Sequence, residues 1–289
     1  MMLIDEVAMV KILFSEIPVL PFSTLVMETT LALEGVFAAG NAILDVYKQD
    51  FKTTFKAEQE PLTEADLRSN TILLAALQKT NIPILSEETA DFSGRVSNDT
   101  IWIIDPLDGT KEFIQKNGEF VIMIALVKKG TPILGIVYQP TTGMLYLAQQ
   151  GQGVFEKNGQ SWKRLHVSTV DDIMQARAVL SKSHLKEKDR QFMDEIGVSN
   201  FSQKGSAGLK IGLLCSGEAD FYFNPSDKVK EWDTAAGYCM ITEAGGRMTD
   251  LFGKELCYNQ ADVVHRKGIL VSNGKLQQQL VERLKAFYQ

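Results

Sequence analysis

The residues best suited to chemistry lie in one stretch, Trp102 to Phe113, with the sequence WIIDPLDGTKEF. Its apolar start predicts a buried strand that ends at Pro106 and brings Asp105 and Asp108 to the strand's end. Because proline fixes one φ angle and lacks an N–H donor, we expect a turn that places both carboxylates and the Leu107 carbonyl on one side. Oxygen atoms gathered in this way predict a cage for a hard cation.

Gly109 and Thr110 follow these acids directly. If a helix or an anion-binding nest begins there, two backbone N–H groups and the threonine hydroxyl face an anion beside the cation. The implied chemistry is a metal next to a phosphate. Aspartate followed by glycine is also a common turn pair, so this motif has a purely structural alternative.

Two more acidic elements lie far away in the sequence. Glu87 and Glu88 follow the apolar run 82–85, and Asp233 lies within the segment 231–236, EWDTAA. Neighbouring side chains on a strand point to opposite faces, so at most one of the two glutamates is expected to bind a given ion. For Asp233 the structural alternative is a favourable charge in the first turn of a helix. Three separate acidic elements favour one common site.

Asp66 has two interpretations. It stands three positions after Thr63, a typical N-cap residue, so its carboxylate would complete a capping box at the start of a predicted helix. It also precedes the other acids in the chain and is available to the same site. The residues alone support capping and a role in chemistry equally.

The order of these motifs resembles the magnesium-dependent, lithium-sensitive phosphomonoesterase superfamily that includes the inositol monophosphatases. Within it, Lys111 to Phe113 and the segment 117–120, NGEF, resemble the 3'(2'),5'-bisphosphate nucleotidases of CysQ type. The likeness extends from about Met27 to the C-terminus. It implies an α/β fold of mixed α+β character, a layered α-β-α-β-α sandwich of the inositol monophosphatase and fructose bisphosphatase type.

The resemblance also implies a cofactor, two or three magnesium ions. An oxygen-only ligand set suits magnesium and not zinc, and the histidines do not cluster in the sequence. Magnesium in such a site can polarise a phosphoryl oxygen and activate water. The implied metal ligands are Glu87, Asp105, the carbonyl of Leu107, Asp108 and Asp233.

Catalytic roles follow from the same resemblance for Asp66, Glu87 and Thr110. Glu87 and Thr110 would orient the attacking water, while Asp66 would align the Thr110 hydroxyl. The phosphate would rest on the backbone N–H groups of Gly109 and Thr110, and no covalent phosphoenzyme is required.

The segment from Gly205 to Lys210, GSAGLK, resembles the glycine-rich, lysine-bearing loop of bisphosphate nucleotidases, where a second phosphate and the nucleoside lie. A plain loop before a helix is its structural alternative. Ser226 stands where inositol monophosphatases usually carry a glutamate that grips an inositol hydroxyl. The expected substrate contacts are Gly109, Thr110, Ser183, His184, Gly205, Ser206, Lys210 and Asp233, with a surface position as the alternative for His184.

We therefore predict a magnesium-dependent phosphomonoesterase that removes the 3'-phosphate of adenosine 3',5'-bisphosphate, and of phosphoadenylylsulfate in the same way, by metal-activated water. An inositol monophosphatase or another sugar phosphatase is the alternative. A non-catalytic metal- or nucleotide-binding regulator is less favoured, because every acid of the family motif and Thr110 are present.

Composition limits the class of protein. The chain has 289 residues, 45% hydrophobic and 23% charged, as in ordinary soluble globular proteins. A formal net charge of -6 argues against a nucleic acid polymer as partner and leaves a small phosphorylated molecule. Cys215, Cys239 and Cys257 lack metal-site spacing, so free thiols in a reducing cytoplasm are expected.

Residues 1–22 carry acids and lack the basic start of a secretory signal, which argues against a signal peptide. Because this segment lies ahead of the region that resembles the family, we expect it to form an N-terminal extension. No apolar run is expected to reach membrane-spanning length, and no stable membrane span is expected. Glycines near residue 155 suggest a boundary between an N-terminal α+β subdomain, residues 23–155, which carries the metal-site loops, and a C-terminal α/β subdomain, residues 156–289, which completes the site. A homodimer is compatible with the sequence.

The spacing of apolar residues predicts the elements that position these groups. Helical periodicity predicts helices over 23–47, 66–79, 186–196 and 209–214, and one that opens at Trp232. Apolar runs bounded by turn residues predict strands over 83–86, 120–128, 132–139, 143–148, 176–181 and 219–223, of which 120–128, 132–139 and 143–148 form an antiparallel meander.

Overall fold

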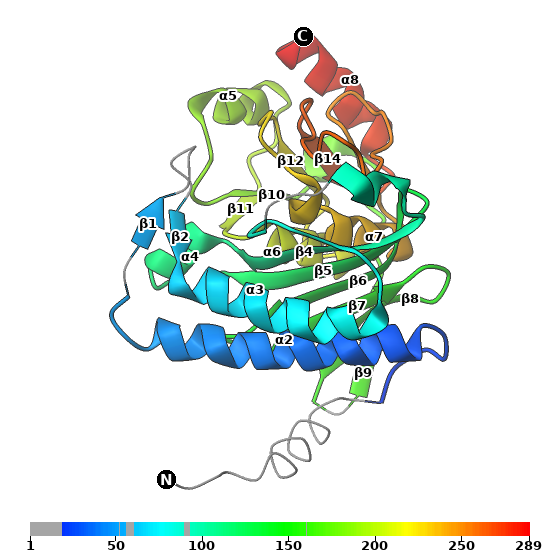
Figure 1. Cartoon of the computed structure of the whole chain (residues 1–289). Helices are drawn as coiled ribbons and strands as arrows, with labels where there is room; N and C mark the ends of the chain where they lie inside the picture. Colours follow the sequence, from blue (N-terminus) through cyan, green and yellow to red (C-terminus); the bar gives the residue numbers. More distant parts are fainter. Residues whose placement is uncertain (1–18, 52, 56–60, 90–92, 160) are drawn as a thin grey trace, which may run out of the picture.

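Two β-sheets and the helices packed on them make up the frame of the molecule (Figure 1). The computed structural model describes residues 19–289 apart from 52, 56–60, 90–92 and 160. Most of the predicted extension over residues 1–22 therefore lies outside the described residues.

The larger sheet has seven strands in the order β3-β4-β5-β6-β7-β8-β9. The β3–β4 pair is parallel and the other pairs are antiparallel. The predicted meander is confirmed as β5, β6 and β7. The strands are β3 Ile84–Ser86, β4 Thr100–Asp108, β5 Val121–Lys128, β6 Thr131–Gln139, β7 Met144–Gln149, β8 Gly153–Asn158 and β9 Ser161–Arg164.

The smaller sheet has five strands in the order β11-β10-β12-β14-β13. β10 pairs in parallel with β11 and β12, and β14 pairs antiparallel with β12 and β13. Both strands predicted for this half, β10 and β12, are present, while β11, β13 and β14 were not predicted. The strands are β10 Ala178–Ser181, β11 Phe201–Lys204, β12 Phe221–Asn224, β13 Arg247–Thr249 and β14 Ile269–Ser272.

The helices separate and cover the two sheets, so the layers alternate as α-β-α-β-α, which confirms the predicted sandwich (Figure 1). One outer layer holds α2 Val26–Tyr47 and α3 Glu64–Leu77, the middle layer α6 Ala207–Cys215 and α7 Ala235–Glu243, and the other outer layer α5 Glu187–Glu195 and α8 Gln277–Tyr288. Short elements are β1 Thr53–Phe55, β2 Pro61–Thr63, α4 Thr110–Ile114, and the 3-10 turns η1 Gln78–Thr80, η2 Ser93–Ser97, η3 Ile173–Gln175 and η4 Glu231–Asp233.

Strand β5 lies inside the larger sheet, between β4 and β6, and is buried on both faces. Met123 and Ala125 pack into the core between the sheets, whereas Ile122 and Ile124 pack into the core under α2 and α3. A strand covered on both faces needs apolar side chains at every position, which explains the unbroken apolar run in the sequence.

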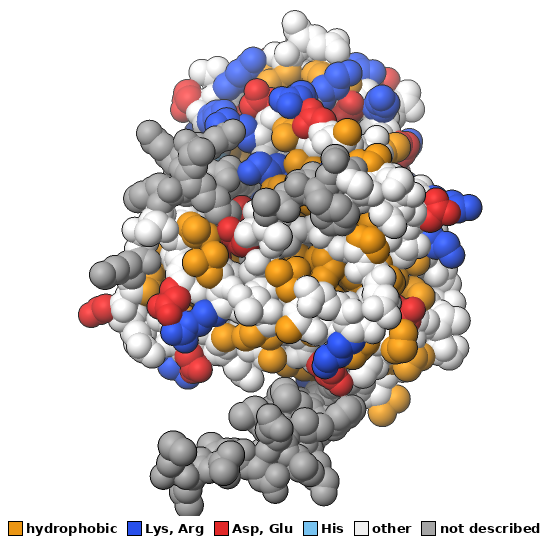
Figure 2. Space-filling model, in the orientation of Figure 1, with side chains coloured by type: hydrophobic (Ala, Val, Ile, Leu, Met, Phe, Trp, Pro, Cys, Tyr) orange, Lys and Arg blue, Asp and Glu red, His pale blue; other side chains and the backbone are white. Residues whose placement is uncertain are grey.

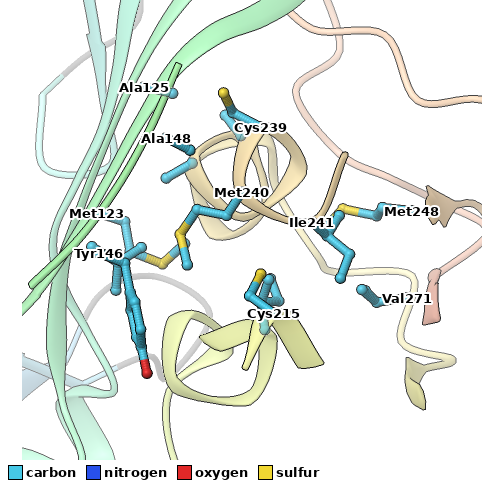
Figure 3. Close-up of a cluster of buried hydrophobic side chains, with 14 of the residues drawn as sticks. Met123, Ala125, Tyr146, Ala148, Cys215, Cys239, Met240, Ile241, Met248 and Val271 are labelled. Atoms are coloured by element: carbon cyan, nitrogen blue, oxygen red, sulfur yellow. The ribbon is translucent and has the colours of Figure 1, made fainter. Parts of the chain in front are cut away.

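The middle helix α7 buries apolar side chains against both sheets, because it lies between them. Figure 3 shows Met240 pointing toward Met123 of the larger sheet, while Ile241 lies near Met248 and Val271 of the smaller one. Cys239 also lies in this core, and all three cysteines of the chain are free thiols, as predicted. The core between the sheets therefore holds the two halves of the chain together.

Helix α2 is long and apolar enough to cross a membrane by length and composition, so the expectation that no run reaches this length is wrong. Its position explains the composition. Ala32, Leu33, Val36 and Ile43 are fully buried in the core formed with α3 and the larger sheet. An apolar helix of this kind is typical of the covered interior of a globular fold.

Two elements near the acidic motifs differ from the prediction. Strand β4 does not end at Pro106 but continues to Asp108 with an irregular register. The helix predicted to open at Trp232 is divided, because η4 ends at Asp233 and α7 begins at Ala235. The larger sheet also continues to Arg164, past the proposed subdomain boundary near residue 155.

Substitution of Gly135 by alanine should destabilise the fold. A Cβ at Gly135 on β6 would lie 2.5 Å from the carbonyl oxygen of Ala236 on α7, so the middle helix would have to move away from the sheet. We expect Gly135→Ala to lower the free energy of unfolding by about 1–3 kcal/mol in urea titrations, the usual effect of overpacking. Thr131→Ala, at an exposed position on the same strand, is the control, and equal losses in both variants would contradict the argument.

Candidate active site

The parallel pairing of β3 and β4 brings the first two acids together. Ser86 is opposite Ile104 in the register, and the Glu87 N–H donates a hydrogen bond to the Ile104 carbonyl at 3.3 Å. Glu87 therefore lies beside Asp105 where the paired region of these two strands ends. Side chains gathered at the carboxyl ends of parallel strands are well placed to bind ligands.

A bulge in β4, rather than the predicted turn, arranges the acidic motif. Asp105 is opposite Met123 and Asp108 is opposite Val121, so β4 has one more residue than β5 between these pairs. Pro106 lies inside the bulge, where its missing N–H breaks no ladder bond. The Leu107 N–H donates to Asp105 Oδ1 at 2.9 Å, which orients that carboxylate.

The segment after the bulge forms the short helix α4, as one alternative predicted. Gly109 precedes it with φ 98°, a left-handed conformation that favours glycine, and a Cβ there would lie 3.1 Å from the Glu119 carbonyl oxygen. Thr110 begins the helix, and its hydroxyl donates to Asp66 Oδ1 at 3.1 Å. The structure therefore brings Asp66 and Thr110 into contact.

Asp66 satisfies both of its interpretations at once. Its Oδ2 accepts hydrogen bonds from the Thr63 N–H at 2.7 Å and the Thr63 hydroxyl at 2.6 Å, which completes the predicted capping box of α3. Its Oδ1 is left for Thr110. Burial raises the pKa of Asp66, while the bonds from Thr63 and Thr110 oppose that shift.

Asp233 reaches the site from the 3-10 turn η4, which packs against β4 and β5. The backbone N–H of Lys230 donates to Asp233 Oδ2 at 2.7 Å. This is an N-terminal capping bond, so the structural alternative for Asp233 is also realised. The bond engages one carboxylate oxygen and fixes the plane of the group.

The acids repel one another strongly. Burial raises the pKa of Asp105 well above its usual value, and the charges of Glu87, Asp108 and Asp233 raise it further. Burial and the charge of Glu87 likewise raise the pKa of Asp233. A bound divalent cation would remove this repulsion.

No three His, Cys, Asp or Glu side chains in the described part of the chain form a compact cluster that could hold an ion by themselves. Magnesium does not require such a cluster, because it is commonly held by one or two carboxylates together with water and substrate phosphate oxygens. The oxygen-only donors and their mutual repulsion therefore fit a hard divalent cation that shares its coordination with the substrate.

These groups line a cavity of about 480 Å³. Asp66 and Ser183 do not line the cavity, but each contacts a residue that does. Asp66 accepts a hydrogen bond from Thr110, and Ser183 donates its hydroxyl hydrogen to Glu112. The structure brings the other predicted site residues into the lining, namely Glu87, Asp105, Leu107, Asp108, Gly109, Thr110, His184, Gly205, Ser206, Lys210 and Asp233.

Basic side chains line another part of the same cavity. Lys111, Lys186 and Lys228 reach it from different segments, and the Lys111 ammonium lies 3.5 Å from Nδ1 of His184. Burial lowers the pKa of His184, and the charges of Lys111 and Lys210 lower it further. Figure 2 shows that lysine and arginine side chains gather over the part of the surface where α5 and α8 lie.

Lys210 is buried and faces its own loop. Its ammonium donates to the carbonyls of Gly205 at 2.6 Å and Ser206 at 2.7 Å. Burial lowers its pKa to about 8. The predicted glycine-rich loop is therefore closed on itself by the lysine that was expected to meet a phosphate.

Several lining residues escaped the sequence argument, among them Lys111, Glu112, Ser181, Tyr222, Asn224 and Lys228. Lys111 and Glu112 stand in a motif that the sequence singled out, so their proximity to the acids was a usable signal. Tyr222 and Asn224 lie on β12, and nothing in their local sequence marks them as functional.

Comparison with known proteins matches the model of the inositol monophosphatase family to residues 27–287. The 3'(2'),5'-bisphosphate nucleotidase CysQ of Escherichia coli strain K12 is 35% identical over 241 residues, covering 81% of this chain and 95% of that protein. The protein of the same name from Haemophilus influenzae is 31% identical over 232 residues, covering 79% of this chain and 86% of that protein.

Solved structures agree in fold. The crystal structure of CysQ from Bacteroides thetaiotaomicron, a bacterial member of the inositol monophosphatase family, has a TM-score of 0.75 and 32% identity, covering 87% of this chain and 99% of that one. The extragenic suppressor protein suhB from Bartonella henselae has a TM-score of 0.76 and 25% identity, covering 89% of this chain and 98% of that one.

The raised pKa of Asp105 predicts a stability that depends on pH and metal. A carboxyl whose pKa is higher in the folded chain stabilises the fold at low pH, and this contribution is lost as pH rises from about 4 through the raised pKa. At pH 7.5 in chelator, Asp105→Asn should therefore melt at a higher temperature than the wild type. Magnesium should raise the melting temperature of the wild type more than that of the variant.

Differential scanning calorimetry with and without magnesium measures both effects. Asp194→Asn, at an exposed position on α5, is the matched control and should behave as the wild type. A lower melting temperature for Asp105→Asn in chelator would show that the repulsion is already relieved within the chain.

Proposed function

Because the chain belongs to the inositol monophosphatase family, we propose that it is a magnesium-dependent 3'(2'),5'-bisphosphate nucleotidase that hydrolyses the 3'-phosphate of adenosine 3',5'-bisphosphate. Members of the family are metal-dependent phosphatases. One observation supports the proposal above the others. A single cavity combines mutually repelling acids, among them the buried Asp105, with the lysines Lys111, Lys186 and Lys228, so it suits a cation and a multiply charged anion together.

The proposed ligands of magnesium lie on different elements that converge at the cavity. Glu87 follows β3, Asp105 and Asp108 flank the β4 bulge, and Asp233 ends η4. The carbonyl of Leu107 lies between the two aspartates. When bound, magnesium would polarise the phosphoryl group and increase the acidity of water.

The chain's own groups orient the attacking water in this proposal. The Thr110 hydroxyl donates its hydrogen to Asp66, so its oxygen lone pairs can accept a hydrogen from water. The Glu87 carboxylate accepts the other hydrogen as general base. The water oxygen then attacks phosphorus, the bond between phosphorus and the ribose oxygen breaks, and that oxygen takes up a proton.

The backbone N–H groups of Gly109 and Thr110 hold the phosphate that is cleaved. We propose that Lys111 and His184 hold the second phosphate. Both residues line the cavity, they come from separate elements, and the Lys111 ammonium lies 3.5 Å from Nδ1 of His184. A dianionic phosphate at that place would raise the lowered pKa of His184 and gain a charge-assisted hydrogen bond.

An inositol phosphatase is the second candidate, and one position argues against it. Ser226 lines the cavity where the family's inositol-specific members usually carry a glutamate. A non-catalytic regulator is disfavoured by the contact between Thr110 and Asp66, which a purely binding site does not need. We place the enzyme in the cytoplasm, which the free cysteines support.

The substrate is tested by a phosphate-release panel. Adenosine 3',5'-bisphosphate should be hydrolysed with a higher kcat/KM than inositol 1-phosphate or fructose 1,6-bisphosphate. Only a nucleoside that carries a second phosphate near the scissile one is expected to contact both the acids and the lysines that line the cavity. Chelation should abolish release and added magnesium should restore it. A preference for inositol 1-phosphate would overturn the nucleotidase proposal, and full activity in chelator would overturn the metal proposal.

Lys111→Ala should separate binding of the second phosphate from chemistry. A lost charge-assisted contact is worth about 1.5–3 kcal/mol, so kcat/KM for adenosine 3',5'-bisphosphate should fall roughly 10- to 100-fold, mainly through KM. Hydrolysis of p-nitrophenyl phosphate, which has one phosphate, should change little. Lys267→Ala, at an exposed position outside the cavity lining, is the control. Equal losses on both substrates would instead assign Lys111 to the scissile phosphate.

A further inference from the structure

Ser206 has an unusual backbone for a residue with a side chain. Its φ is 28° and its ψ is 134° at the N-cap of α6, within the range of positive φ that side chains rarely adopt. Such a conformation is strained and persists only where the surroundings impose it. Strain of this kind is a reason to ask what the residue does.

The surroundings of Ser206 impose the conformation from both sides. The Gly205 N–H donates to Glu119 Oε2 at 2.8 Å, and a Cβ at Gly205 would lie 2.3 Å from Cγ of Glu112. The Lys210 ammonium holds the carbonyls of Gly205 and Ser206 from the helix side. The loop is therefore fixed before and after the serine side chain.

Glu119 is itself anchored. Lys182 lies 3.2 Å and Lys204 3.3 Å from its carboxylate. Burial raises its pKa, but the Gly205 N–H and the two lysines outweigh this and hold the pKa below the usual value. Glu119 therefore remains an ionised acceptor that holds the loop in place.

The fixed loop aims the serine hydroxyl at an acid of the site. Ser206 is 4% exposed, and its hydroxyl donates to Asp108 Oδ2 at 2.6 Å. The Gly208 N–H donates to the same oxygen at 3.1 Å. Both donors engage one oxygen of Asp108 and so define the direction of the other.

We propose that Ser206 is a positioning residue for Asp108. The Ser206 hydroxyl orients the Asp108 carboxylate for magnesium and so couples the substrate loop to the metal site. This inference rests on the proposed function, in which Asp108 is a metal ligand. A partner that orients a ligating carboxylate typically changes metal affinity or activity 10- to 100-fold when it is removed. A displaced loop would therefore weaken the metal site as well as the substrate contacts.

Ser206 also caps α6, since its Oγ accepts a hydrogen bond from the Leu209 N–H at 3.3 Å. Two variants separate capping from positioning. Ser206→Ala loses the cap and the bond to Asp108 and keeps the strained backbone. Ser206→Gly also loses the hydroxyl, but glycine tolerates positive φ and is a better N-cap residue than alanine.

The experiment is isothermal titration calorimetry of magnesium binding to the full chain, with melting temperatures measured in parallel. Both Ser206→Ala and Ser206→Gly should bind magnesium roughly 10- to 100-fold more weakly than the wild type, while Ser206→Gly melts at or above Ser206→Ala. Ser216→Ala is the matched control, because Ser216 lies at the other end of α6 and its hydroxyl donates to Leu213. Its magnesium affinity should equal that of the wild type.

The inference would be overturned if both Ser206 variants bound magnesium as tightly as the wild type and only Ser206→Ala melted at a lower temperature. Ser206 would then be only a helix cap. In that case the proposed hydrolysis of adenosine bisphosphate by the wild type would be unaffected. Failure of the wild type to bind magnesium would overturn the inference together with the metal part of the proposed function. If the wild type bound magnesium but did not hydrolyse the bisphosphate, only the proposed substrate would be wrong.

Discussion

The structure depends on holding several acids, Asp105 buried and the others half-buried, close together against their mutual repulsion. Burial and neighbouring charges raise the pKa of Asp105 and Asp233, so the fold must compensate for an arrangement that the acids alone disfavour. It does so with backbone N–H groups and one hydroxyl. Leu107, Lys230 and Ser206 each donate to one carboxylate oxygen at 2.6–2.9 Å. Orienting the acids without neutralising them keeps the site attractive to a divalent cation.

The sequence predicted the layered fold well where apolar patterns are long. Helix α2 and strands β5 to β7 are continuous, mostly buried segments bounded by turn residues, and periodicity marks such segments strongly. Strands β11, β13 and β14 were missed because they have three or four residues and are defined by pairing with distant strands. The bulge at Pro106 was mistaken for a turn, since both use a proline without an N–H and only the pairing with β5 distinguishes them.

The site could be predicted as a set of residues, together with the one contact between Asp66 and Thr110, but its other contacts could not. The family motif singled out Asp66 and Thr110, and their contact is present at 3.1 Å. The basic wall was missed because Lys111, Lys186 and Lys228 come from segments separated by many residues, and only the junction of the two sheets brings them together. The acids come mainly from the larger sheet and the lysines largely from the smaller one. The site therefore needs both sheets and the middle helices that hold them together.

Lys210 shows why a residue's type does not fix its role. Its ammonium donates to two carbonyls of its own loop, and burial lowers its pKa to about 8. A neutral lysine amine still has two N–H donors, the number that these carbonyls require. The loop can therefore stay closed whether or not the lysine is charged, while the contribution of Lys210 to the positive charge of the cavity is lost as pH rises past 8. The geometry of the loop and one part of the electrostatic attraction for substrate thus depend on the same side chain but respond differently to pH.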